Sequence, residues 1–224
     1  MPTAKGGYFS KSRPGLRVPG TTTVISRFKE AGGLMHWSWD LGMKGIDYRT
    51  VRDQAADAGT LAHAAVEAWV RRRPFTPPQW ADAIEAHGPE VVERAEKAYG
   101  AFLEWARQTQ LTVTETEVAL VSETHLYGGT LDAVLVSGKR AIGDWKTAKA
   151  LYPDMLLQIA AYGRLWDETH PDDPITGGYH LLRFDKEYGD FHAHWWGELE
   201  TAWQAFLHLR ALYELEKELK ARVK

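Results

Sequence analysis

GGTLDAVLVSGKRAIGDWKT, residues 128–147, is the stretch of sequence that decides the fold. It contains two runs with the length and apolar pattern of β-strands, Gly129–Val136 and Arg140–Trp145. Ser137-Gly138-Lys139 lies between the runs and predicts a tight turn, so the two strands are expected to pair antiparallel. The sequence therefore predicts a β-hairpin, and this hairpin is the centre of the expected sheet.

Charged side chains gather at the open end of this hairpin. Side chains alternate between the two faces of a strand, so Asp144 and Lys146 project to one side and Trp145 to the other. Asp132 and Asp144 are each six residues from Gly138, which makes them near cross-strand partners. Two carboxylates and an ammonium group are therefore expected to converge at one end of the hairpin.

This combination of groups is suited to phosphodiester chemistry. Mg²⁺ takes oxygen ligands and keeps several water molecules. Such an ion neutralises phosphate charge and supplies hydroxide near neutral pH, while a lysine can orient the attacking water and offset charge in the transition state. Each residue alone has an ordinary alternative, because Asp144 and Lys146 could form a surface ion pair and Asp132 could cap the preceding turn. The hairpin register favours the functional interpretation.

Three short motifs carry a resemblance to a known family. Gly129-Thr130-Leu131-Asp132, Asp144-Trp145-Lys146-Thr147 and Gln158-Ile159-Ala160-Ala161-Tyr162 together resemble the PD-(D/E)XK nuclease superfamily, in particular its RecB-like and lambda-exonuclease-like branch. The resemblance covers Thr21 to Trp196. It implies a restriction-endonuclease-like core and metal-dependent cleavage of DNA. Leu131 replaces the proline of the nominal motif, and Asp144 stands where glutamate is common.

The resemblance also implies roles for residues outside the hairpin. Gln158 and Tyr162 lie four apart on one helix face and are expected to contact the catalytic lysine and the DNA backbone. Gly59-Thr60-Leu61-Ala62-His63 matches the G-T-x-x-H pattern of the same branch, which implies a metal-ligating histidine. The expected metal ligands are His63, Asp132, Asp144 and the Trp145 backbone carbonyl, with Glu67 or Glu117 as a further candidate.

Other polar and aromatic residues have two interpretations. Arg71, Arg72 and Arg73 end a predicted helix, where cations complement the helix dipole, and DNA phosphate contact is the alternative. Lys149 is assigned to DNA binding with them, as are Gln158 and Tyr162. His192 and His194 share one face of a predicted strand, and without a third ligand nearby an exposed strand face is favoured over a metal site. Trp37 or Trp39 could stack on bases if exposed.

The order of predicted elements defines the fold class. Periodicity and turn residues predict helices over 21–28, 34–43, 50–73, 79–86, 89–109 and 153–168 and from 198, and further strands over 113–121, 179–184 and 190–196. This order predicts a single α/β domain with a helical N-terminal half and a central mixed β-sheet flanked by helices. Residues 1–20 are expected to form a basic, flexible N-terminal arm, and residues 21–224 the nuclease domain.

Composition sets further bounds. The chain has 224 residues and no cysteine, which excludes disulfides, thiolate metal sites and an iron–sulfur cluster. Residues 1–29 contain six basic side chains and no acidic one, whereas the rest contains 21 basic and 30 acidic side chains. A basic arm on an acidic body fits a phosphate contact, and a solvated tail is an equal alternative. No apolar run is long enough for a membrane span or a secretory signal, so a cytoplasmic location is expected.

The sequence thus predicts a Mg²⁺- or Mn²⁺-dependent deoxyribonuclease, an exonuclease of recombination, repair or replication that resembles phage enzymes. Its expected partners are single- or double-stranded DNA ends, with a recombination or annealing protein as a candidate and no membrane. A structure-specific endonuclease or resolvase using the same site is one alternative. A catalytically silent nucleic-acid-binding module is the other.

Overall fold

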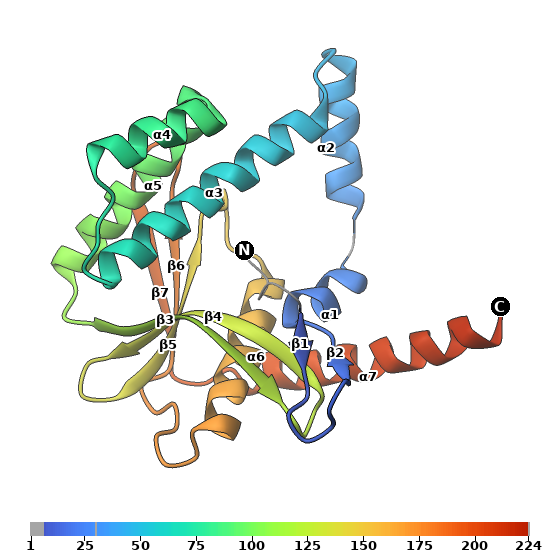
Figure 1. The fold of residues 1–224 in the computed structure, drawn as a ribbon. Coiled ribbons are helices and arrows are strands. Elements are labelled where there is room, and N and C mark those ends of the chain that lie inside the picture. Colours follow the sequence, from blue (N-terminus) through green and yellow to red (C-terminus); the bar gives the residue numbers. More distant parts are fainter. Residues whose placement is uncertain (1–6, 30, 224) are drawn as a thin grey trace.

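The computed structural model describes residues 7–29 and 31–223 of the chain. The N-terminal half is helical, and prolines at the first helical positions of two of its helices supply a fixed φ where no N–H is needed (Figure 1). The helices of this half are α1 (Thr21–Arg27), α2 (Gly32–Met43), α3 (Tyr48–Val70), α4 (Pro77–His87) and α5 (Pro89–Gln108).

The described residues of the C-terminal half form a five-stranded mixed sheet in the order β3-β4-β5-β6-β7. All neighbouring strands pair antiparallel except β5 and β6, which are parallel and are joined by helix α6 (Pro153–Thr169). A parallel pair requires such a crossover. The strands are β3 (Thr112–Ser122), β4 (Tyr127–Val136), β5 (Arg140–Lys146), β6 (Tyr179–Phe184) and β7 (Phe191–Trp196). The predicted α/β class and the single domain are confirmed.

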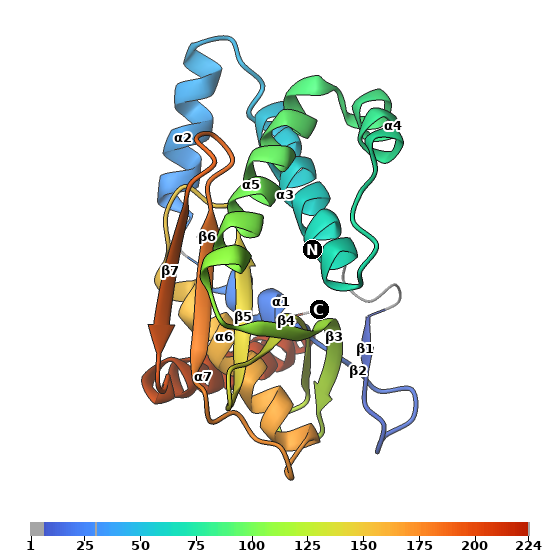
Figure 2. The same ribbon diagram turned by 90° about the vertical axis from the view of Figure 1, so that its left-hand side faces the viewer.

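Helices cover both faces of the sheet and create two hydrophobic cores. Helices α3 and α5 pack over one face, around Phe102, Trp105 and Trp145. Helix α6, together with α1 and α7 (Glu200–Arg222), packs over the other face, around Leu131 and Trp166. Figures 1 and 2 show the two groups of helices above and below the sheet. Residues on α3 and on α6 can therefore meet only where the sheet opens between them.

The β4–β5 hairpin has the register that the sequence predicts. Its pairs run from Val136 opposite Arg140 to Ala133 opposite Gly143. Gly138 in the turn has φ +73°, a left-handed conformation that glycine adopts without steric cost. The same register would place Asp132 opposite Asp144, but the backbone pairing ends one residue earlier.

A small hairpin lies within the predicted N-terminal arm. Strands β1 (Tyr8–Phe9) and β2 (Arg17–Val18) pair antiparallel, and the following Pro19 carbonyl accepts a hydrogen bond from the Gly128 N–H at 2.9 Å. The carboxylate of Glu123 accepts further hydrogen bonds from this segment. The sequence did not indicate this hairpin, because its contacts join residues more than 100 positions apart. Residues 1–6 of the predicted arm lie outside the described residues.

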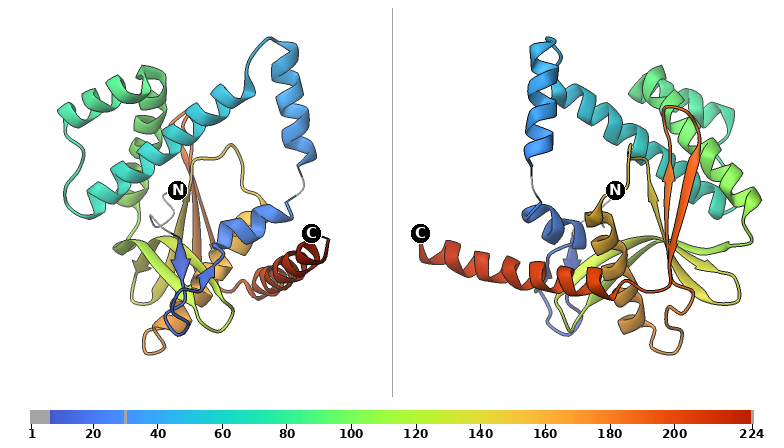
Figure 3. Two further views of the ribbon diagram at one scale, coloured as in Figure 1. Left: turned by 45° about the vertical axis from the view of Figure 1, so that its right-hand side comes forward. Right: turned by 180° about the vertical axis from the view of Figure 1, so that it is seen from behind.

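Two helices extend away from the body. Helix α2 begins at Gly32, two residues before the start that the sequence predicts, and it has no buried residue. The C-terminal part of α7 also projects beyond the sheet (Figure 3). Within the described residues, no helix is long and apolar enough to cross a bilayer.

Candidate active site

The site begins where β4 and β5 separate. Beyond the pair Ala133–Gly143, the Trp145 N–H donates its hydrogen bond to Asp132 Oδ2, at 2.8 Å, instead of to a backbone carbonyl. The Asp132 side chain is 2% exposed, so a buried N–H and a buried carboxylate satisfy each other. Asp132 thus closes the gap between the diverging strands and fixes its own carboxylate there.

Asp144 and Lys146 form a buried ion pair on the same face of β5. Lys146 Nζ lies 2.6 Å from Asp144 Oδ2, and neither residue is more than 9% exposed. The Lys146 ammonium is thus the group that offsets the charge of this buried oxygen, which has no other hydrogen-bond partner among the described residues. A carboxylate oxygen has two lone pairs, so Asp144 Oδ2 keeps acceptor capacity for a further cation.

Helix α6 adds a network of hydrogen bonds to this pair. Lys146 Nζ donates to Gln158 Oε1 at 3.1 Å, and Gln158 Nε2 donates to the Tyr162 hydroxyl oxygen at 2.9 Å. Gln158 Nε2 also lies 3.4 Å from Asp144 Oδ1. Burial raises the pKa of Tyr162 well above its usual value, so the phenol stays protonated. The Gln158 amide therefore bridges Lys146, Asp144 and Tyr162.

Helix α3 contributes His63 from the opposite side. Its Nδ1 atom lies 4.0 Å from Asp132 Oδ2. Burial and the nearby Lys146 cation lower the pKa of His63 to about 4, so its ring is neutral at physiological pH. A neutral imidazole is the form that binds metal ions.

Glu117 completes a group of three adjacent ligands. It lies opposite Asp132 on β3, between the pairs Thr116–Ala133 and Val118–Leu131. Its φ is +54°, a left-handed conformation that costs a side-chain-bearing residue about 1–2 kcal/mol. Burial and the Asp132 charge raise the pKa of Glu117 to about 7. Strain and unfavourable charge at one residue are typical of functional sites.

His63, Glu117 and Asp132 can hold a metal ion. One ligand atom from each lies within 4.8 Å of the others. Ligand atoms at about 2.0–2.5 Å from one ion are separated by roughly 3–5 Å, so the spacing fits. One imidazole and two carboxylates suit divalent ions such as Mn²⁺, Zn²⁺ or Mg²⁺.

Two other expected ligands, Glu67 and Asp144, lie outside this group of three. Glu67 pairs with Arg71 at 2.7 Å, one helical turn away, and the group of three does not include it. Asp144 is also outside this group, although burial and its neighbour Asp132 raise its pKa as they raise that of Glu117. Sequence reasoning ranked Glu117 below Asp144, because the left-handed turn of β3 that brings Glu117 to the site has no motif.

Two glycines of the motifs allow the elements of the site to approach one another. A Cβ atom on Gly59 would lie 2.9 Å from Thr147 Oγ1, which follows Lys146. A Cβ atom on Gly129 would lie 2.6 Å from the Tyr162 ring. Both glycines therefore have a packing function that brings α3 and α6 to the strands.

Tyr8 is a neighbour of the site that sequence reasoning missed. Its hydroxyl is 2.9 Å from Thr130 Oγ1, two residues before Asp132, and its ring packs against Gly128. No pattern in residues 1–20 indicates this contact.

The predicted DNA-binding cations Arg71, Arg72, Arg73 and Lys149 are exposed on the surface. Arg71 is paired with Glu67, and Lys149 is 82% exposed and 3.7 Å from Glu187. His192 and His194 are exposed on β7 and are absent from the metal-ligating group found in the described residues. Trp39 on α2 is 60% exposed.

Comparison with known proteins gives likenesses in structure but none in sequence. No family model and no curated protein sequence matches the chain. The fold is similar to the crystal structure of a "putative exonuclease" from Eubacterium rectale, with a TM-score of 0.47 and 12% sequence identity. The similarity covers 71% of this chain and 65% of that protein, so the chain spans less than two thirds of its length.

Proposed function

We propose that this protein is a metal-dependent nuclease of the PD-(D/E)XK superfamily that hydrolyses DNA phosphodiester bonds from a strand end. One observation carries the proposal: two buried carboxylates and a buried lysine, Asp132, Asp144 and Lys146, lie together where β4 and β5 separate. Burying an ionised group costs several kcal/mol, which is comparable to the net free energy of unfolding of a whole domain. The presence of three such groups at one place therefore supports a functional role for them.

The metal-binding role falls to His63, Glu117 and Asp132, with Asp144 and the Trp145 carbonyl as further proposed ligands. The buried Asp144 Oδ2 atom, which has the Lys146 ammonium beside it and a second lone pair for another cation, supports adding Asp144. A divalent ion bound there would neutralise phosphate charge and supply a water molecule of lowered pKa.

Lys146 is the proposed catalytic cation. Asp144 and Gln158 hold its Nζ atom from two sides, which fixes the ammonium group at the mouth of the strand gap. In this position it can orient an attacking water molecule and offset the negative charge that develops on the phosphate. Tyr162 positions Lys146 through Gln158, since the phenol oxygen accepts a hydrogen bond from the amide that binds the lysine.

DNA contacts are proposed for Arg71, Arg72, Arg73 and Lys149, together with Gln158 and Tyr162. These cations are exposed, as phosphate contacts must be. The proposal has three further parts. The enzyme cleaves from a DNA end, it uses Mg²⁺ or Mn²⁺, and it acts with a recombination or annealing protein.

The test is cleavage of end-labelled single-stranded and duplex DNA with Mg²⁺ or Mn²⁺. Asp144→Asn and Lys146→Ala should each reduce the rate by roughly 100-fold or more, because each removes a group that acts in the transition state. Asp154→Asn is the matched control, since Asp154 pairs with Lys29 on the exposed start of α6. Full cleavage by either site variant would contradict the proposal.

Further substrates separate the alternatives. Cleavage of closed circles or of flapped DNA in preference to linear DNA would favour a structure-specific endonuclease or resolvase. DNA binding without cleavage across several metal ions would favour a catalytically silent binding module.

A further inference from the structure

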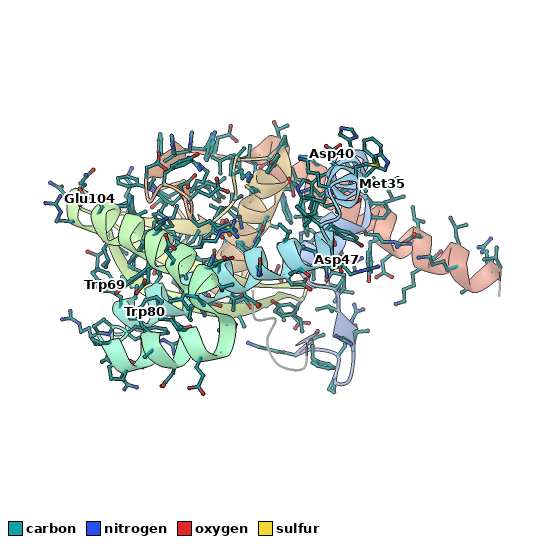
Figure 4. The ribbon with its side chains drawn as sticks, turned by 90° about the horizontal axis from the view of Figure 1, so that it is seen from above. Met35, Asp40, Asp47, Trp69, Trp80 and Glu104 are labelled. Atoms are coloured by element: carbon teal, nitrogen blue, oxygen red, sulfur yellow. The ribbon has the colours of Figure 1, made fainter. Side chains whose placement is uncertain are left out.

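A surface cavity lies between the C-terminal ends of α3 and α5 and the start of β3. It has a volume of about 510 Å³. Its walls include two tryptophans, Trp69 and Trp105, with Pro74, Leu111 and Val113. Figure 4 shows Trp69 and Glu104 at this end of the molecule, opposite the end that carries Met35 and Asp47. The cavity thus has aromatic and aliphatic walls together with polar groups, and none of the proposed catalytic residues lines it.

Trp69 is held in place but remains accessible. Its ring packs edge-to-face on Phe102, with ring centroids 5.3 Å apart and an interplanar angle of 82°. The residue is nevertheless 38% exposed, whereas Trp105 is only 4% exposed and forms a buried wall. A fixed, accessible indole ring is a stacking platform for a flat ligand.

The residues that line the cavity include one arginine and no carboxylate, and a second arginine, Arg73, follows in sequence. Arg72 lines the cavity, and within residues 7–29 and 31–223 neither Arg72 nor Arg73 forms an ion pair, in contrast to Arg71. Arg72 also has φ +58°, so its backbone is strained. The cations complement the end of the α3 dipole, yet they remain available to an anion. A ligand that is flat on one side and anionic on the other matches these walls.

The cavity shares two elements with the proposed metal ligands. His63 precedes Trp69 by six residues of α3, or about 9 Å along the helix. Val113 precedes Glu117 by four residues of β3, or about 13 Å along the strand. A nucleic-acid strand could therefore occupy both places at once, with only a few nucleotides between them.

We propose that this cavity binds an unpaired base of single-stranded DNA, stacked on Trp69, with Arg72 and Arg73 contacting the adjacent phosphate. Stacking tolerates every base, while the guanidinium groups contact the backbone. The proposal rests on the proposed nuclease function and deepens it. It states that the protein holds an unpaired part of the DNA substrate at a place away from the metal site.

The test is fluorescence anisotropy of a labelled oligothymidylate with the full chain in EDTA, where no cleavage occurs. Trp69→Leu should weaken binding about tenfold or more, since it removes the stacking surface but keeps an apolar side chain. Arg72→Gly should weaken binding and reduce the salt slope by about 1, as expected for one lost phosphate contact. Arg107→Gln is the matched control, because Arg107 is exposed at the end of α5 and paired with Glu104.

Several results would overturn the proposal. These are unchanged binding by both site variants, an equal loss with Arg107→Gln, or an equal dependence on Trp69 for a blunt duplex. Thermal unfolding separates folding from binding: glycine relieves the positive φ at Arg72, so Arg72→Gly should be no less stable than the parent protein. If Trp69→Leu is poorly folded, Arg72→Gly and Arg73→Gln decide the result.

The binding and cleavage measurements test the two proposals separately. Normal oligonucleotide binding by Trp69→Leu and Arg72→Gly with intact cleavage would overturn the base site and leave the nuclease. Full cleavage by Asp144→Asn would overturn the catalytic assignment and leave the binding measurement in EDTA unaffected.

Discussion

The Asp132 carboxylate takes the place of a backbone acceptor for the Trp145 N–H, 2.8 Å away, where β4 and β5 separate. The two residues are 13 positions apart and flank the hairpin turn. A side chain that closes a sheet at the site of the proposed chemistry links folding to function.

Asp132→Ala should therefore destabilise the metal-free protein more than Asp132→Asn does. Alanine leaves the buried Trp145 N–H without an acceptor, at a cost of about 1–3 kcal/mol, whereas asparagine keeps an acceptor and removes a buried charge next to Asp144. Denaturant unfolding in EDTA measures the difference. Isothermal titration with Mn²⁺ should show weakened binding in both variants. Equal stabilities of the two variants would contradict this role of Asp132.

Glu117→Gly should increase metal-free stability and decrease metal affinity. Glycine relieves the left-handed backbone at φ +54°, which stabilises the folded state by up to about 1 kcal/mol. Glu117→Gln is the matched control, since it loses the charge and keeps the strain. Denaturant unfolding and Mn²⁺ titration are the two measurements. A Glu117→Gly protein that binds Mn²⁺ as tightly as the parent would exclude Glu117 as a ligand.

The N-terminal hairpin should detach as the pH falls. Hydrogen bonds from Ser10, Ser12 and the Lys11 N–H lower the pKa of Glu123 to about 2, below its usual 4.5. A lowered carboxyl pKa stabilises the fold above pH 4.5, and this contribution is lost as the pH falls toward 2. The protection factor of the Lys11 amide, which is its intrinsic exchange rate divided by its measured rate at the same pH, should decrease over that window.

Glu123→Gln provides the control for the hairpin. Its Lys11 amide should exchange faster than in the parent at pH 7, because the charge-assisted hydrogen bonds are gone. Its exchange should then follow only the intrinsic pH dependence of the amide. Protection at Lys11 that is the same in both proteins from pH 7 to pH 3 would show that Glu123 does not hold the hairpin.

Gly59→Ala should destabilise the protein by up to about 2 kcal/mol: the new Cβ atom would lie 2.9 Å from Thr147 Oγ1, at a cost of about 1–3 kcal/mol, and the helix propensity of alanine offsets about 1 kcal/mol of that cost. Thr147→Ala removes that oxygen, so the double variant should recover part of the loss. A double-mutant cycle of unfolding free energies should give a coupling of at least about 0.5 kcal/mol. Additive losses would mean that Gly59 is required for another reason.

Local patterns predicted the parts of the fold that depend on neighbours in sequence. The β4–β5 register followed from counting outward from Gly138, and the helices followed from apolar spacing and proline positions. The parallel pairing of β5 and β6 agrees with the predicted mixed sheet, since a helix separates the two strands. These features are set by turn geometry and by the two periods of secondary structure.

Features that depend on distant contacts were not predictable. The β1–β2 hairpin is held by Glu123 and Gly128, more than 100 residues away, and its short strands have no periodic signal. The contact of Tyr8 with Thr130 arises only from that docking. The position of Glu117 beside Asp132 depends on one left-handed residue inside a strand, a conformation that a glutamate side chain does not indicate.

Asp132 Oδ2 has two neighbours that compete for its lone pairs. The same oxygen accepts the Trp145 N–H and lies nearest to His63 Nδ1, at 4.0 Å. A cation drawn to this oxygen withdraws electron density from it and weakens its hold on the amide. The amide hydrogen of Trp145 is thus an internal reporter of the site. Its exchange rate and chemical shift should change when the Asp132 carboxylate binds a cation.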